Sequence, residues 1–209
     1  MKVLIRGITA VFLTVSLLVL AFYSIRIVWA EMFYLNGVAY LEHWSQEHAE
    51  KQQNFTVAPG ELEQAEHSFQ RAIRLGPDNP RYLLQASKLH YWQDRAENYH
   101  YLGHKEDDWG NLRTTILMRP AWPYGWLSLA LSKSRHSVID GEFSQALLQA
   151  MLLGPREPDI RKEAVRLGSY YDHWLDESVR QAWKEQVERM AIRQRNHLPE
   201  PVKKDKRKR

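Results

Sequence analysis

Residues 65–80 read AEHSFQRAIRLGPDNP, and this stretch decides the fold class. Its small and apolar residues recur every three or four positions up to Leu75, which is the pattern of a helix with one buried face. Proline cannot continue a helix but fits its first position, so Pro77 ends this helix and Pro80 begins the next one. The stretch therefore predicts two helices joined by a tight turn.

The same frame occurs twice more along the chain. Residues 143–158 read FSQALLQAMLLGPREP, and residues 112–123 read LRTTILMRPAWP, with fewer small residues. The segments that follow the three turns, at 81–93, 124–134 and 159–171, lack proline and are largely amphipathic, so each predicts a second helix. No segment carries a clear strand pattern. The sequence thus predicts an all-α array of helical hairpins.

A closing helix and a tail are predicted at the C-terminal end. Residues 175–196 carry apolar side chains along one side of a helix and charges along the other. Pro199 and Pro201 then stop the helix, and the Lys and Arg run after them is too polar to pack. We therefore expect a disordered basic tail over residues 199–209.

The N-terminal segment is expected to cross a membrane. The 19 residues from Gly7 to Ile25 carry no charge. As a helix they span about 28 Å, which matches a bilayer hydrocarbon core of roughly 30 Å. We predict a transmembrane helix over residues 7–28, followed by a helical repeat domain over residues 29–198. A cleaved signal peptide is the alternative, although the apolar run is longer than a typical signal core.

Charge near the two ends predicts how the chain is oriented. Lys2 and Arg6 precede the apolar run, and the positive-inside tendency places residues 1–6 in the cytoplasm and the repeat domain across the membrane. The net charge of +4 comes from the two ends of the chain, because residues 31–199 carry 20 basic and 23 acidic residues. This mildly acidic central part does not indicate nucleic-acid binding, and we predict no nucleic-acid partner.

The hairpin pattern resembles the tetratricopeptide repeat family. Each unit of that family, about 34 residues long, places an aromatic residue, Leu and a small residue in its first helix, then Ala, an aromatic residue, Ala and Pro in its second. Insertions at 52–60 and 94–108 interrupt the spacing. The residues that fit are Ala65, Phe69, Ala72 and Pro77 for a second helix, with Phe33, Gly37, Tyr40 and Trp126, Leu129, Ala130 for first helices.

The resemblance implies a concave groove lined by one face of the helices. Side chains of Tyr with Arg and Lys on that face suit peptide backbones, carboxylates or acidic polymers. An ordinary solvated helix face is the alternative interpretation. The implied partner-binding residues are Tyr34, Arg81, Lys88, Tyr91, Tyr124, Lys162 and Arg166.

Catalytic chemistry is not indicated. The chain has no cysteine, which excludes thiolate nucleophiles and cysteine metal sites. His100 and His104 are four apart and precede the acidic residues 106–108, but Gly103 and this acidic cluster favour a loop rather than a metal-binding helix. Glycine-rich phosphate loops and nucleophile elbows are absent from the sequence. We therefore predict no enzyme, no metal and no cofactor.

The overall layout resembles the VpsP-type polysaccharide biosynthesis proteins. It shares a short N-terminal anchor followed by Trp- and Tyr-rich helical hairpins. The resemblance implies a single-pass protein of the bacterial inner membrane with a periplasmic domain. Such a protein would act as a scaffold or adaptor for exopolysaccharide biosynthesis or export, with protein components of that membrane machinery as partners. The alternatives are a module that binds an acidic glycan through Trp109 and Trp122, and a glycan-modifying enzyme.

Overall fold

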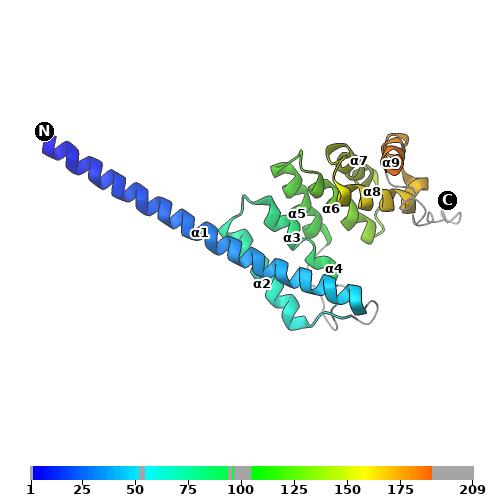
Figure 1. Cartoon of the computed structure of the whole chain (residues 1–209), viewed down its shortest axis with the longest axis horizontal. Helices are drawn as coiled ribbons and strands as arrows, with labels where there is room; N and C mark the ends of the chain where they lie inside the picture. The colour runs from blue at the N-terminus through cyan, green and yellow to red at the C-terminus, as the bar shows by residue number, and fades with distance from the viewer. Residues whose placement is uncertain (1, 52–54, 94–95, 97–104, 190–209) are drawn as a thin grey trace. The chain divides into compact units, whose positions relative to one another are not determined.

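The computed structural model describes residues 2–51, 55–93, 96 and 105–189 (Figure 1). These residues are mainly helical and form no β-strand, so the all-α class is as predicted. The chain divides into two compact units, Met1–Leu102 and Gly103–Arg209.

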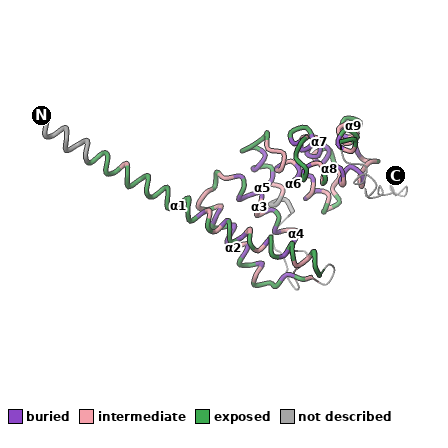
Figure 2. Tube along the Cα trace, viewed as in Figure 1, coloured by how far each residue is buried: buried purple, intermediate pink, exposed green. Residues whose placement is uncertain are grey.

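The first unit is organised around one continuous helix, α1 (Lys2–Lys51). Its first half extends beyond the other helices of the unit, and its apolar side chains from Val11 to Trp29 are largely exposed (Figure 2). The helix is long and apolar enough to cross a membrane. It continues without a break past residue 28, and from Val11 onward Ala30 is the first buried residue. The apolar segment and the first helix of the hairpin domain therefore form one continuous helix.

Helix α2 (Pro59–Leu75) packs antiparallel against the second half of α1. Three polar contacts between the two helices show the antiparallel direction. Later residues of α1 contact earlier residues of α2. From the far end of α1 towards its apolar half, the contacts are Trp44 Nε1 to Glu61 Oε2 at 2.9 Å, Asn36 Nδ2 to Ser68 Oγ at 2.9 Å, and Arg26 Nε to the Leu75 carbonyl at 2.6 Å.

Gly37 allows the two helices to approach closely. The ring of Phe69 lies against Gly37, and a Cβ atom on this glycine would sit 2.8 Å from Phe69 Cζ. The ring itself is buried, together with Ala65 and Ala72 on the same face of α2. The small and aromatic residues of the frame thus meet where the sequence pattern expected close helix packing.

The segment predicted as one helix over 81–93 is instead two, α3 (Pro80–Ala86) and α4 (Leu89–Gln93). Asn79 caps α3, since its side chain accepts a hydrogen bond from the backbone N–H of Arg81 at 3.1 Å. The helix is interrupted at Ser87, whose hydroxyl donates to the Leu84 carbonyl at 2.8 Å. Serine side chains compete with the helix backbone for such carbonyls, which accounts for the break.

The two insertions meet at the far end of α1. Val57 and Ala96 form an isolated parallel β-bridge, and Val57 is buried. The ring of Phe55 packs edge-on against Trp92 at 5.9 Å, and Trp92 lies 5.9 Å from the ring of Trp44 on α1. The extra residues therefore extend the aromatic core of the first unit.

The second unit contains further helical hairpins. Pro123 and Pro158 occupy the first positions of their helices, as the Pro-x-x-Pro motifs predict. Its elements are α5 (Lys105–Met118), α6 (Pro123–Arg135), α7 (Gly141–Leu153), α8 (Pro158–Tyr171), the 3-10 helix η2 (Asp172–Trp174) and α9 (Glu177–Glu188).

The start of α5 differs from the sequence prediction, and the closing helix α9 is described only in part. The acidic residues 106–108 lie in the first turn of α5, so the expected loop is wrong at these positions. Negative charge is favourable at a helix N-terminus, where the backbone N–H groups are unpaired. The predicted closing helix over 175–196 is described as α9 up to Glu188, and the predicted tail over 199–209 lies outside the described residues.

Candidate partner-binding surface

The seven predicted groove residues divide between the two units. All but Lys88 belong to a helix, and Lys88 lies in the turn between α3 and α4. Tyr34, Arg81, Lys88 and Tyr91 belong to the first unit, and Tyr124, Lys162 and Arg166 belong to the second.

Tyr34 is a core residue of the first unit rather than an exposed contact. Its side chain is 4% exposed, and its ring lies 5.1 Å from the ring of Tyr82. The Arg81 guanidinium covers the Tyr34 ring at 5.0 Å and donates to its hydroxyl at 3.3 Å. Arg81 is itself exposed, so its apolar stem and its charge seal the α1–α3 contact from outside.

Glu31 completes this polar contact. The Tyr82 hydroxyl donates to Glu31 Oε2 at 2.9 Å, and Arg81 lies 3.9 Å from Glu31 Oε1. Burial, and then the hydrogen bond to Glu31, raise the pKa of Tyr82 above its ordinary value. Tyr82 therefore stays protonated and keeps its role as donor across the α1–α3 seam.

A surface groove of about 350 Å³ lies between α1 and the α3–α4 pair. Leu41 and Trp92 are buried side chains at this groove, while Glu42 and Lys88 are exposed and bring one charge of each sign to it. Its lining residues are Val38, Leu41, Glu42, Ser45 and Gln46 from α1, with Gln85, Lys88 and Trp92 from the α3–α4 segment.

Lys88 is the predicted residue that lines this groove. Tyr91 is half-buried and packs edge-on against the groove residue Trp92, with ring centroids 4.9 Å apart. The residues of α1 between Val38 and Gln46 were missed by sequence reasoning. A signal was present, because Leu41 and Trp44 are apolar positions one and two turns after Gly37 in the first-helix frame.

The three predicted residues of the second unit lie on α6 and α8. The Tyr124 hydroxyl donates to Glu157 Oε2 at 3.2 Å. Arg166 pairs with Glu163 one turn earlier at 2.7 Å, and its guanidinium lies 5.9 Å from the Tyr170 ring. Lys162 is exposed on α8.

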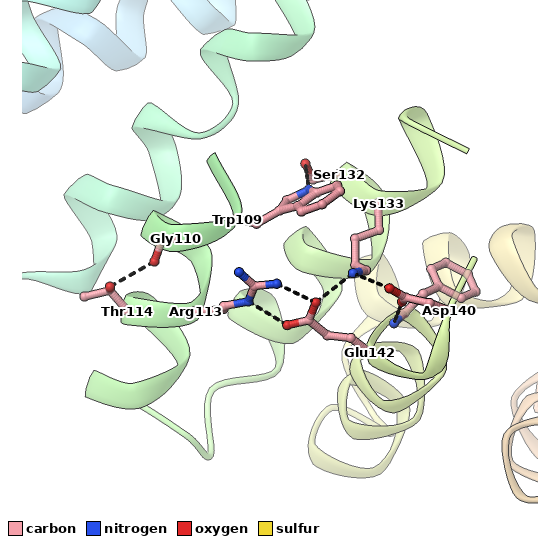
Figure 3. A network of polar contacts seen from close by, with 9 residues as sticks. Trp109, Gly110, Arg113, Thr114, Ser132, Lys133, Asp140 and Glu142 are labelled. Atoms are coloured by element: carbon pink, nitrogen blue, oxygen red, sulfur yellow. Dashed lines mark hydrogen bonds and ion pairs between the residues drawn. The ribbon is translucent and has the colours of Figure 1, made fainter. Parts of the chain in front are cut away.

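The second unit holds a buried lysine that sequence reasoning missed (Figure 3). Lys133 is 2% exposed, and its Nζ donates to Asp140 Oδ2 at 2.9 Å and to Glu142 Oε2 at 2.7 Å. Arg113 of α5 holds the same glutamate through two hydrogen bonds, at 2.7 and 2.8 Å. The network thus ties α5, α6 and the start of α7 together.

The Trp109 side chain packs against this network. Lys133 Nζ lies 4.6 Å from the Trp109 ring centroid, and the indole N–H donates to Ser132 Oγ at 3.1 Å. The polar edge and one ring face are therefore engaged within the unit. Trp122 is likewise half-buried, with the Arg119 guanidinium 5.1 Å from its ring.

Both carboxylates of the network are held ionised. Hydrogen bonds from Arg113 lower the pKa of Glu142 from 4.5 to about 2, although burial opposes them. Burial alone would raise the pKa of Asp140, but hydrogen bonds from Lys133 and the Phe143 N–H bring it below its ordinary value. An ionised carboxylate with a lowered pKa is a weak base near neutral pH, and in this network both carboxylates link helices through ion pairs.

Metal binding finds no support in the part of the chain that the structure describes. No group of three or more His, Asp or Glu side chains there could hold a metal ion. The pair His100 and His104 lies outside the described residues.

The groove between α1 and the α3–α4 pair is the strongest candidate surface of the first unit. It combines apolar side chains at Leu41 and Trp92 with opposite charges at Glu42 and Lys88, which is the chemistry of a site for a short polypeptide segment. The chain matches no protein-family model, and no curated protein is similar to it in sequence.

Proposed function

We propose that this chain is a membrane-anchored adaptor that binds a segment of a partner protein in the groove of its first unit. The observation that carries the proposal is the continuity of α1, which runs from the apolar segment into the wall of the groove. Val38 and Gln46 follow Ile25 by 13 and 21 residues. At 1.5 Å per residue, the groove would be held about 20–30 Å from the membrane surface.

We further propose that the partner belongs to a bacterial exopolysaccharide biosynthesis or export machinery. The layout of an apolar N-terminal helix followed by Trp- and Tyr-rich hairpins supports this assignment through its resemblance to the VpsP-type proteins. The contact of Gly37 with Phe69 supports the likeness to tetratricopeptide repeats, because the frame pairs a small residue with an aromatic one. Lys2 and Arg6 support an inner-membrane anchor with the hairpins in the periplasm.

A protein partner suits the groove better than a glycan chain. The groove is small, at about 350 Å³, and its two buried lining side chains are apolar. Trp109, which could stack on a sugar, already has its N–H and one face engaged. An acidic segment with one apolar side chain would complement the positive charge of Lys88 and the apolar lining formed by Leu41 and Trp92.

Removing residues 2–24 should abolish the cellular function while leaving the fold intact. The cut keeps Arg26, which contacts α2, and the buried Ala30, so the hairpins should retain their helical content and melting temperature. Polymer export should fall to the level of a strain that lacks the protein, because an untethered groove no longer holds its partner at the membrane. The measurement is secreted polysaccharide, with an unrelated single-span helix fused at residue 25 as the control that restores export. Full export by the untethered form would contradict the tethering role.

Reversing the charge at the groove should weaken partner capture. We expect Lys88→Glu to reduce recovery of the partner about five- to tenfold, since a rim charge of the wrong sign repels an acidic segment. The matched control is Lys162→Glu, an equally exposed change on α8. Capture is measured by photo-cross-linking from position 85, followed by mass spectrometry, with both variants melting like the parent chain. Unchanged capture by Lys88→Glu would exclude the groove, and cross-links only to proteins outside polysaccharide machinery would contradict the assignment.

A further inference from the structure

We propose that Arg26, Arg71 and Arg74 form a binding site for the phosphate groups of anionic lipids at the membrane surface. The inference rests on the proposed function only in requiring that the apolar half of α1 spans a bilayer. Arg26 is the first charged residue after the uncharged run that ends at Ile25, and it lies in the last turn of the span predicted over residues 7–28, so it would lie at the headgroup level. The other two arginines come from α2, which is distant in sequence.

The antiparallel pairing of α1 and α2 brings the last turn of α2 to the same level. Arg26 Nε donates to the carbonyl of Leu75, the last residue of α2, at 2.6 Å. The Arg71 guanidinium lies 5.1 Å from the ring of Phe33 on α1. Arg74 lies on α2 between Arg71 and Leu75, about one turn closer than Arg71 to the expected membrane surface. The end of α2 therefore faces the point where α1 would leave the bilayer.

Arg26 and Arg71 lie along one edge of the α1–α2 pair, and Arg74 is exposed on the last turn of α2. Phe33 follows Arg26 by seven residues, which is close to two helical turns, so both side chains leave α1 in nearly the same direction about 10 Å apart. Arg71 and Arg74 are three residues apart and share one face of α2. Since Arg71 reaches Phe33 and Arg26 reaches Leu75, these two guanidinium groups lie on the side of the hairpin that Arg26 and Phe33 define.

Aromatic side chains of the same edge support a position at the headgroups. Trp29 is half exposed, and its ring lies 6.1 Å from that of Phe33. Trp and Tyr concentrate at membrane–water interfaces, where their amphipathic rings fit the headgroup level. Arg71 and Arg74 are exposed to solvent at this level.

The acidic residues at this end of the unit do not neutralise the positive charge of the three arginines. Glu31 accepts the Tyr82 hydroxyl and lies beside Arg81, so its charge is already engaged. Asp78 is exposed in the turn that follows α2. A guanidinium offers five N–H donors, of which Arg26 uses its Nε–H for the Leu75 carbonyl. Arginine forks match phosphate oxygens in geometry, so phosphate is the chemistry that this edge fits.

The test uses the full chain in nanodiscs that contain equal amounts of phosphatidylglycerol and phosphatidylcholine. Native mass spectrometry of the released protein then gives the ratio of the two retained lipids. We expect the parent chain to enrich phosphatidylglycerol. Because each basic residue near an anionic surface contributes about fivefold, Arg74→Gln should lower the enrichment about fivefold and the Arg71→Gln/Arg74→Gln variant about 25-fold or to no preference.

Lys51→Gln is the matched control, since it removes one exposed charge about 38 Å further along α1 and should leave the enrichment unchanged. Circular dichroism checks that each variant keeps its helices. Equal retention of the two lipids by the parent chain, or full enrichment in the double variant, would overturn the proposal. Failure of the parent chain to insert into nanodiscs or to resist carbonate extraction would overturn the anchor as well, whereas normal insertion without lipid preference would remove the lipid site alone.

Discussion

Replacing Lys133 with Ala is expected to destabilise the second unit by about 2–3 kcal/mol, which lowers its melting temperature by roughly 10–20 °C. The substitution leaves Asp140 without its cation and Glu142 with Arg113 alone. Breaking a fully buried pair costs more, about 3–5 kcal/mol. Here the Asp140 and Glu142 side chains are 48% and 31% exposed, so water offsets part of the loss.

Thermal unfolding of the full chain, with hydrogen exchange in α6 and α7 to assign the transition, measures this loss. Lys184→Ala is the matched control, because Lys184 is an exposed lysine of α9 whose removal should cost less than 0.5 kcal/mol. Equal effects of the two substitutions would show that the buried network does not stabilise the unit. Lys133→Met with Asp140→Asn should cost less than the sum of the two single changes, since both remove the same ion pair.

The same network predicts a pH dependence. Arg113 lowers the pKa of Glu142 to about 2 in the folded unit, whereas 4.5 is its ordinary value. A carboxylate with a depressed pKa in the folded state stabilises the fold above its unfolded pKa. Its contribution is therefore full above about pH 4.5 and is lost as the pH falls towards 2. The stability difference between the parent chain and Glu142→Gln should shrink over this window.

Helix ends could be predicted from the sequence where proline decides them. Pro80, Pro123 and Pro158 each begin a helix, because the missing N–H and fixed backbone angle of proline suit the first position alone. The break at Ser87 could not be predicted in the same way. It depends on which backbone carbonyl the serine hydroxyl donates its hydrogen bond to, and many serines in helices cause no break.

The sequence could not predict the side-chain contacts between residues that are far apart along the chain. Tyr34 fits the chemistry of a binding residue, but the packing of α3 against α1 places Arg81 over its ring. Lys133 reads as one more charge on an amphipathic helix, and only the fold brings Asp140 and Glu142 to it. The continuity of α1 had a local basis, since no proline or glycine separates the apolar run from Phe33.

Gly37→Leu is expected to open the α1–α2 hairpin at a cost of about 3 kcal/mol. A Cβ atom at this position would lie 2.8–2.9 Å from three atoms of the Phe69 ring, and real Cβ contacts are essentially never that short. The ring is buried between α1 and α2 and cannot turn aside without opening the seam. Gly37→Ala should cost about 1–2 kcal/mol, even though alanine favours a helix over glycine by about 1 kcal/mol.

Gly110→Ala provides a control of opposite sign. Gly110 lies inside α5, and a Cβ atom there would meet nothing within 4 Å, so the helix preference of alanine should stabilise the chain by about 0.5–1 kcal/mol. Equal stability changes for the two alanine variants would contradict the close approach at Gly37. Because the apolar half of α1 is unaffected, Gly37→Leu should remain in the membrane fraction yet lose partner capture. Loss of both would mean that insertion depends on the hairpin, whereas retained capture would exclude the groove between α1 and the α3–α4 pair.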